Sequence, residues 1–322
     1  MEIFKSGRVY DFMGKRIPFL GLSALLVICS LVLLLSKGVN FGIDFAGGTI
    51  VQVKYEQKAP IKDIRNTLKS TQYSNASITE FGSPEEVVIR ITGSSSDLAN
   101  DIGDEMHEIL KSTGNFEVRR VDIVGPKVGG ELREKGIMAL SLSLLVILVY
   151  VSFRFEWRFA VASIFALAHD VIIALGAISL FNIEVNLDIL AAILTILGYS
   201  LNDTIIVFDR IREGVTTSKE AILEKVVNDS VSKTLSRTTL TSLTTFFVVI
   251  TLFLFGGEII HGFAFTMLVG VIVGTYSSIF VAASFLVQLK FSIANFRSKE
   301  ADKIKRQKEK DKMRAMYEQG TV

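Results

Sequence analysis

The sequence is poor in the residues that build disulfides, metal centres and hydrolytic active sites. It contains one cysteine, three histidines and four prolines in 322 residues. The single cysteine, Cys29, cannot close a disulfide within the chain or build a cysteine-based metal site. With so few histidines, neither a Ser/His/Asp pattern nor a metal-ligand spacing rises above chance. We therefore predict no enzyme active site, no metal site and no other cofactor.

A phosphate-binding loop is also missing. The segment GPKVGG (125–130) contains glycines and a lysine, but not in the G-x-x-x-x-G-K-[ST] order of a phosphate loop. We interpret it as a tight turn before a helix. No nucleic-acid partner is predicted, and the net charge of +2 conceals basic residues that gather in particular loops.

Long apolar runs are what the chain has in abundance. Hydrophobic residues make up 49% of it, and its mean hydropathy is +0.44. About 20 apolar residues cross a hydrocarbon core of about 30 Å. We predict a polytopic α-helical membrane protein with a retained first anchor and six spans, at approximately 17–36, 137–153, 159–181, 189–208, 235–255 and 263–289.

Lysine and arginine are distributed unevenly among the short loops. They precede the first span, follow the second, separate the fourth from the fifth and fill the segment after the sixth. The loops 182–188 and 256–262 contain neither residue. Because basic loops stay in the cytoplasm, both termini are predicted to be cytoplasmic. The long segment between the first two spans then lies on the outer side.

That outer segment has the pattern of a small α+β domain. Strands are predicted at 49–55, 76–82, 86–92 and 116–125, and helices at 60–70 and 95–112. The order β-α-β-β-α-β is that of the ferredoxin-like, split βαβ fold. A domain of this size buries its own core and leaves little room for an enclosed ligand chamber.

Four parts follow along the chain. They are an N-terminus with the first span (1–36), the outer α+β domain (37–136), a five-helix bundle (137–289) and a basic tail (290–322). The tail interleaves cations with acidic residues, so a solvated, partly helical end is the default. Contact with anionic membrane lipid is the alternative.

Polar residues recur at helical spacing inside the last three spans. Those predicted to share a face are Thr195, Tyr199, Asn202 and Asp203 in the fourth span, and Thr234, Arg237, Thr238, Thr241 and Thr245 in the fifth. The sixth span repeats small residues every fourth position from Gly262 to Ala282, which favours close helix packing. We predict one packed unit with a polar seam that does not face lipid.

Asp203 is the seam residue whose burial in the membrane is expected to cost a large free energy. A carboxylate near the centre of a membrane helix costs roughly 2.5–3.5 kcal/mol on an insertion scale. Burial favours the protonated acid and a nearby guanidinium favours the ionised form. Movement of Arg237 toward or away from Asp203 is therefore predicted to make the Asp203 carboxylate release or bind a proton. The alternative is that the two residues form a purely structural ion pair.

His169 and Asp170 are adjacent near the middle of the third span. Neighbouring residues on a helix do not share a face, so at most one of them is expected to point into the seam. A structural and a functional role are both open for this pair. If the role is functional, Asp170 competes with Asp203 as the main proton carrier.

Four motifs resemble those of the SecD/SecF family of bacterial protein-export membrane proteins, within the resistance-nodulation-division superfamily. They are FGIDFAGGT (41–49), GPKVGGELREKG (125–136), GYSLNDTIIVFDRIRE (198–213) and TLSRTTLTSLTT (234–245). The resemblance follows nearly the whole chain in order. The third motif is the most specific of the four.

The resemblance implies a subunit of the bacterial inner membrane that pairs with a SecD-like subunit. The pair would use the proton-motive force to help the SecYEG translocon move a preprotein across the membrane. Asp203 and Arg237 match the family's proton-relay positions, with Ser200, Asn202 and Thr241 as motif neighbours in a supporting role. Tyr199, His169 and Asp170 are supporting seam residues by their positions in the spans, not by the resemblance. The alternative is a proton-driven exporter of small molecules or lipids from the same superfamily.

Overall fold

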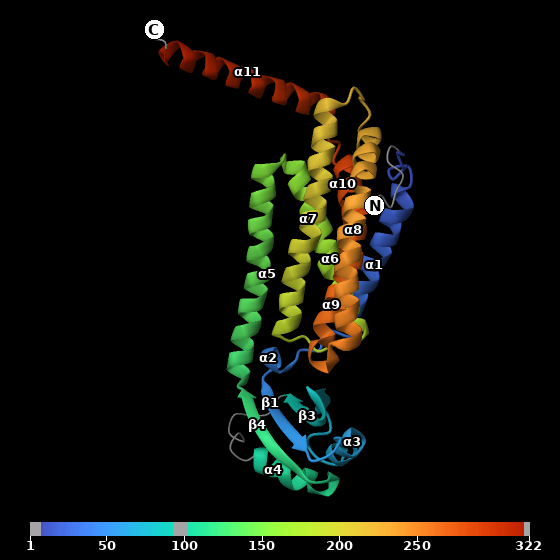
Figure 1. Ribbon diagram of the computed structural model, residues 1–322, viewed down its shortest axis with the longest axis vertical. Helices are drawn as coiled ribbons and strands as arrows, with labels where there is room; N and C mark the ends of the chain where they lie inside the picture. The colour runs from blue at the N-terminus through green and yellow to red at the C-terminus, as the bar shows by residue number, and fades with distance from the viewer. Residues whose placement is uncertain (1–7, 93–101, 319–322) are drawn as a thin grey trace.

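The structure is a computed structural model that describes residues 8–92 and 102–318. In this part of the chain, six long apolar helices form the bundle that stands vertically in Figure 1. Each is long and apolar enough to cross a membrane. Five of them are α1 (Arg16–Ser36), α5 (Pro126–Arg154), α6 (Trp157–Leu180), α7 (Leu187–Thr217) and α8 (Leu223–Phe255). The sixth span consists of α9 (Gly257–Ser277), a π-helical turn (Ser278–Ala282) and α10 (Ala283–Gln288). The predicted six-helix, multi-pass architecture is confirmed.

The six helices are not buried equally. Within their most apolar windows, 61% of residues in α6, 50% in α7 and 56% in the sixth span are buried, against 11–17% in α1, α5 and α8. The three central helices therefore form the core, and the other three surround it. The outer helices expose large apolar side chains such as Leu142, Phe153 and Phe247, as expected for helices that face lipid.

Small residues bring the sixth span against α7, as the four-residue repeat predicts. A Cβ atom added at Gly270 would lie 2.2 Å from Ile196 Cγ1, and one added at Gly274 would lie 3.1 Å from Ser200 Cβ. No side chain fits at the first position without displacing the buried Ile196. The two backbones consequently approach more closely than larger residues would permit.

This packing predicts that Gly270→Ala destabilises the bundle, although alanine is normally the better helix residue. Overpacking of a close contact costs about 1–3 kcal/mol. The midpoint of thermal unfolding in detergent should therefore fall. Gly130→Ala in α5 is the matched control, because nothing lies within 4 Å of its new Cβ. An equal response of the two variants would contradict the close packing of α9 on α7.

The outer domain is a four-stranded antiparallel sheet covered by two helices. Its elements are β1 (Gly48–Tyr55), α3 (Ile61–Lys69), β2 (Ser77–Phe81), β3 (Ser83–Thr92), α4 (Ile102–Leu110) and β4 (Phe116–Val124). The strand order β2-β3-β1-β4 confirms the predicted ferredoxin-like arrangement. Alternate residues of β1 face the helices, so Val51 and Val53 are fully buried with Ile64 and Met106. The predicted start of the second helix lies outside the described residues.

Several helices extend beyond the apolar runs that predict them. α5 begins at Pro126, so most of GPKVGG forms its first turn, and the interpretation of that segment as a tight turn is wrong. Proline suits a helix start because the first N–H groups have no partner within the helix. α7 continues to Thr217 beyond the arginine-rich end of its span. Hydrophobicity marks the membrane thickness, not the helix ends.

Two further helices lie at the ends of the bundle. The short α2 (Ile43–Ala46), which the sequence analysis does not predict, lies between the bundle and the sheet. At the opposite end, α11 (Ile293–Glu318) leaves the bundle sideways (Figure 1). Arg297 anchors it by donating to the carbonyl groups of Val215, Ser218 and Glu220 at 2.6–2.9 Å. From Ile293 to Glu318 the basic tail is thus helical, and it is tied to the end of α7 and the loop that follows.

Candidate functional site

Buried polar side chains gather where α6, α7, α8 and α9 face one another. We call this group the polar core. Its members are His169 and Asp170 on α6; Ser200, Asp203 and Thr204 on α7; Thr234, Thr238 and Ser242 on α8; and Thr266 and Ser277 on α9, each at most 8% exposed. The core lies on the three-helix contact surface that the sequence predicts, with α6 as a fourth contributor.

Asp203 is one of two carboxylates in the polar core and is 1% exposed. The Ser242 hydroxyl on α8 donates a hydrogen bond to Asp203 Oδ2 at 3.3 Å. The Thr275 hydroxyl on α9 in turn donates to Ser242 Oγ at 2.7 Å. Asp203 Oδ1 has no hydrogen-bond partner among the described residues. Three helices therefore meet at this carboxylate, and one of its oxygens has no hydrogen-bond partner and can accept a proton.

Arg237 does not form an ion pair with Asp203 in this structure. Within the described residues, no nitrogen–oxygen contact of 4.0 Å or less joins the two side chains. Arg237 is exposed on α8. The helices that carry them are in contact. The switch between Asp203 and Arg237 stays a prediction.

Asp170 is the second carboxylate and is fully buried. Its Oδ2 accepts hydrogen bonds from the hydroxyls of Ser200 at 2.5 Å and Ser277 at 2.8 Å, while Oδ1 lies 2.9 Å from His169 Nδ1. Both residues of the His169–Asp170 pair are buried, but the printed hydrogen bonds to α7 and α9 are those of Asp170. That at most one of the two points into the seam stays a prediction. Both are buried because α6 is the central helix, with α1, α5, α7 and α9 packed around it.

The predicted face of α7 is divided between the interior and the surface. Asp203 points inward, whereas Asn202 and Thr195 are exposed on this chain. Adjacent helix residues differ in direction by about 100°, which separates Asn202 from Asp203. Tyr199 is half-buried, and its hydroxyl is buried without a hydrogen-bond partner in the described part of the chain. The face is only partly covered by this chain's own helices.

The predicted supporting residues Ser200 and Thr241 bond groups other than Asp203. Ser200 donates to Asp170, not to Asp203. The Thr241 hydroxyl bonds the carbonyl groups of Arg237 and Thr238 in its own helix, at 3.1 and 2.9 Å. This is the common use of a hydroxyl in a membrane helix, and it gives Thr241 no direct contact with Asp203.

Three residues of the hydrogen-bond network were missed by the sequence analysis. Ser242 follows Thr238 by four residues, so its position on the same helix face was available from spacing. Thr275 and Ser277 do not belong to the four-residue repeat of the sixth span. Only their contacts with Ser242 and Asp170 identify them.

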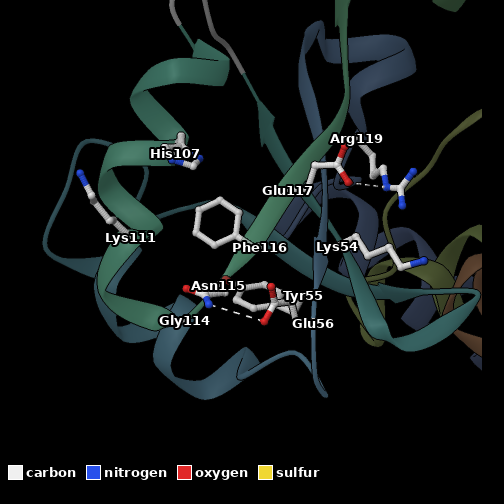
Figure 2. A pocket seen from close by; sticks show the side chains of 10 residues that line it. All are labelled: Lys54, Tyr55, Glu56, His107, Lys111, Gly114, Asn115, Phe116, Glu117 and Arg119. Atoms are coloured by element: carbon white, nitrogen blue, oxygen red, sulfur yellow. Dashed lines mark hydrogen bonds and ion pairs between the residues drawn. The ribbon is translucent and has the colours of Figure 1, made fainter.

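An open cleft lies far from the polar core, on the outer domain between β1, β4 and α4 (Figure 2). Its volume is about 590 Å³. The Phe116 ring forms its floor, with centroids 5.3 Å from Tyr55 and 5.1 Å from His107. Lys54, Lys111 and other charged side chains rim it. It is a solvent-exposed groove on the sheet domain and not an enclosed chamber.

The polar core supplies groups that bind and pass protons: two carboxylates, an imidazole and several hydroxyls. Across residues 8–92 and 102–318, no three His, Cys, Asp or Glu side chains are placed to hold a metal ion. Because Asp203 and Asp170 receive hydrogen bonds from neighbouring helices, a change of protonation at either would alter helix–helix contacts.

Comparison with known proteins gives matches along the whole chain. The family "Protein export membrane protein SecD/SecF, C-terminal" matches residues 105–292, and the "SecD/SecF GG Motif" matches residues 32–59. "Protein translocase subunit SecF" of Helicobacter pylori strain J99 is 49% identical over 323 residues, covering 100% of both chains. The protein of the same name from Calditerrivibrio nitroreducens is 46% identical and covers 90% of this chain and 97% of its own.

The fold has a counterpart among solved structures. The crystal structure of SecDF, a translocon-associated membrane protein from Thermus thermophilus, superposes with a TM-score of 0.78 at 36% identity. The match covers 89% of this chain, which spans 40% of the length of that SecDF chain. The family motifs, the full-length relatives and the shared fold agree with the resemblance drawn from the sequence. The chain therefore belongs to the SecD/SecF family of protein-export membrane proteins.

Proposed function

We propose that this chain is an accessory subunit of the Sec protein-export machinery, which uses the proton-motive force to help move preproteins across a bacterial inner membrane. The observation that carries the proposal is its full-length similarity to proteins named translocase subunit SecF. Both termini are proposed to lie in the cytoplasm and the sheet domain in the periplasm. The basic loops and the position of the sheet opposite α11 support that orientation.

The proposed coupling element is Asp203 with Arg237. The Asp203 carboxylate is buried and has one oxygen without a partner in the described structure. Its other oxygen accepts a hydrogen bond from Ser242, which belongs to the same helix as Arg237. Proton uptake removes the negative charge that attracts both Ser242 and the guanidinium. The contact between α7 and α8 then weakens, so proton binding is converted into helix movement.

A SecD-like partner is proposed to cover the open face of α7 and α8. Asn202 and Thr195 on α7 and Arg237 and Thr244 on α8 are exposed on this chain, although they lie within helices of membrane-spanning length. Arginine and amide groups are costly in contact with lipid tails. A second helix bundle that packs here would supply polar partners and complete the surroundings of Arg237. Contacts with SecYEG and with the preprotein belong to the same proposal.

The rival function, export of small molecules or lipids, has less support. The described outer domain contains one sheet of four strands, and its cleft is an open groove rather than a chamber that would enclose a small substrate. The match of the whole chain to translocase subunits also favours protein export.

Reconstitution tests the proposed function. Vesicles containing SecYEG, a partially translocated preprotein and the SecD-like partner would be prepared with and without this chain. We expect an imposed proton gradient to accelerate completion of export only when the chain is present. A protonophore that collapses the gradient should remove the difference. Equal acceleration in vesicles without the chain would contradict the proposal.

A further inference from the structure

The polar core contains a second candidate for proton binding that the Asp203–Arg237 pair does not use. Asp170 accepts hydrogen bonds from Ser200 on α7 and Ser277 on α9, and its other oxygen lies 2.9 Å from His169 Nδ1. The two serine hydroxyls donate to the carboxylate, and His169 is a third donor if its Nδ1 carries the hydrogen. Asp170 is thus surrounded by hydrogen-bonding groups inside the bundle, and it is 0% exposed.

His169 provides the proton acceptor. If Nδ1 carries a hydrogen, it donates to Asp170 Oδ1, and the neutral imidazole then presents a lone pair at Nε2. His169 is 5% exposed, and Nε2 is buried without a hydrogen-bond partner among the described residues. An unpaired acceptor in a buried site is costly. Its presence beside a buried anion indicates a group that pairs in another state.

We propose that His169 Nε2 is a proton-binding site, with Asp170 as the counter-ion of the imidazolium. Without the added proton, the pair consists of neutral His169 and ionised Asp170 and carries a charge of −1. With the proton on Nε2, the imidazolium and the carboxylate sum to zero. Uptake therefore neutralises a buried charge in a segment of the bundle that is surrounded by apolar helices.

The His169–Asp170 pair has no other strong cation close to it in the described structure. Among the described residues, no lysine or arginine lies within 4.0 Å of Asp170. The titratable groups on the helices packed against α6 are Asp203 and Tyr199 on α7, Tyr276 on α9, Tyr150 on α5 and Cys29 on α1, apart from residues near the helix ends. The Tyr276 ring lies beside His169, with centroids 6.4 Å apart.

Protonation of His169 would alter the hydrogen bonds made by the sixth span. The imidazolium attracts the Asp170 charge, so the hydrogen bonds from Ser200 and Ser277 become weaker. Ser277 immediately precedes the π-helical turn Ser278–Ala282, and such turns often occur at functional sites. Thr275, two residues earlier, bonds the Ser242 hydroxyl beside Asp203. The same short segment of α9 consequently touches both carboxylate sites.

This inference goes beyond the proposed function, because it concerns proton uptake by the chain itself and does not depend on what a proton gradient drives. The chain offers a clean measurement, since it contains only three histidines. Solid-state NMR of the full chain, labelled with ¹⁵N-histidine and reconstituted in liposomes, would follow each imidazole from high to low pH. His169→Gln identifies the signal of His169, and exposed His107 is the internal reference.

We expect Nε2 of His169 in the unaltered chain to change from the unprotonated to the protonated signature as the pH falls. Asp170→Asn removes the counter-ion and should lower the proton affinity of His169 by at least about tenfold, whereas Asp170→Glu should retain uptake. Unchanged His107 and His261 signals verify the fold of each variant. A His169 Nε2 that stays unprotonated while His107 titrates would overturn the proposal, even if Asp170→Asn fails to fold. Equal uptake in Asp170→Asn would overturn the role of Asp170.

Discussion

Asp203→Asn is expected to abolish the gradient-dependent part of preprotein export in reconstituted vesicles. Asparagine has nearly the same shape as aspartate, and its carbonyl oxygen can still accept the hydrogen bond from Ser242. It cannot take up or release a proton, so the cycle proposed for α7 and α8 cannot run. The rate of export in a gradient should fall to the rate measured without one. Export measured without a gradient should be unchanged.

Asp209→Asn is the matched control for this variant. Asp209 lies on the same helix, six residues further along, but it is exposed and pairs with Arg154 on the surface at 3.0 Å. Exposed ion pairs contribute about 0–1 kcal/mol, so we expect a normal response to the gradient. Export that responds equally to a gradient in Asp203→Asn and in the unaltered chain would rule out Asp203 as the proton carrier.

The fold was predictable where the sequence has a clear hydrophobic pattern, either a long apolar run or an alternation of apolar and polar residues. Apolar runs gave the six spans, because only helices satisfy their own backbone in lipid. Alternation gave the strands, and the order of elements gave the sheet topology. The short helix α2 escaped because it has four residues and no apolar period. The start of α5 and the end of α7 were missed because the first turns of α5 and the last turns of α7 are polar and lie beyond the hydrophobic thickness.

The candidate site was predictable only in part. Spacing placed Asp203 on an inward face and predicted a polar stripe on α8, and both helices do contribute to the polar core. Spacing within one helix does not reveal which neighbour faces each side chain. Ser200 therefore contacts Asp170 instead of Asp203. His169 and Asp170 are both buried because other helices of the bundle pack around α6. That packing depends on the whole bundle and cannot be deduced from the sequence of α6 alone.

Gly48→Ala is expected to be the most destabilising small substitution at the junction between the outer domain and the membrane helices. Gly48 begins β1 and is paired with Thr92 of β3 and Val124 of β4. Its φ is +155°, and an added Cβ would lie 2.2 Å from the carbonyl oxygen of Ile91. That oxygen belongs to the backbone of a paired strand and cannot rotate away as a side chain would.

The expected cost of Gly48→Ala is about 3 kcal/mol or more, from the strained backbone and the clash together. Gly82→Ala separates the two effects, because Gly82 also has a positive φ, +76°, but nothing lies within 4 Å of its new Cβ. Hydrogen exchange of the β1 and β3 amides would report the stability of the sheet, with α6 as an internal reference. Much faster exchange in Gly48→Ala than in Gly82→Ala is the expected result. Equal exchange would mean that backbone conformation alone, and not the close approach of β3, requires glycine at the start of β1.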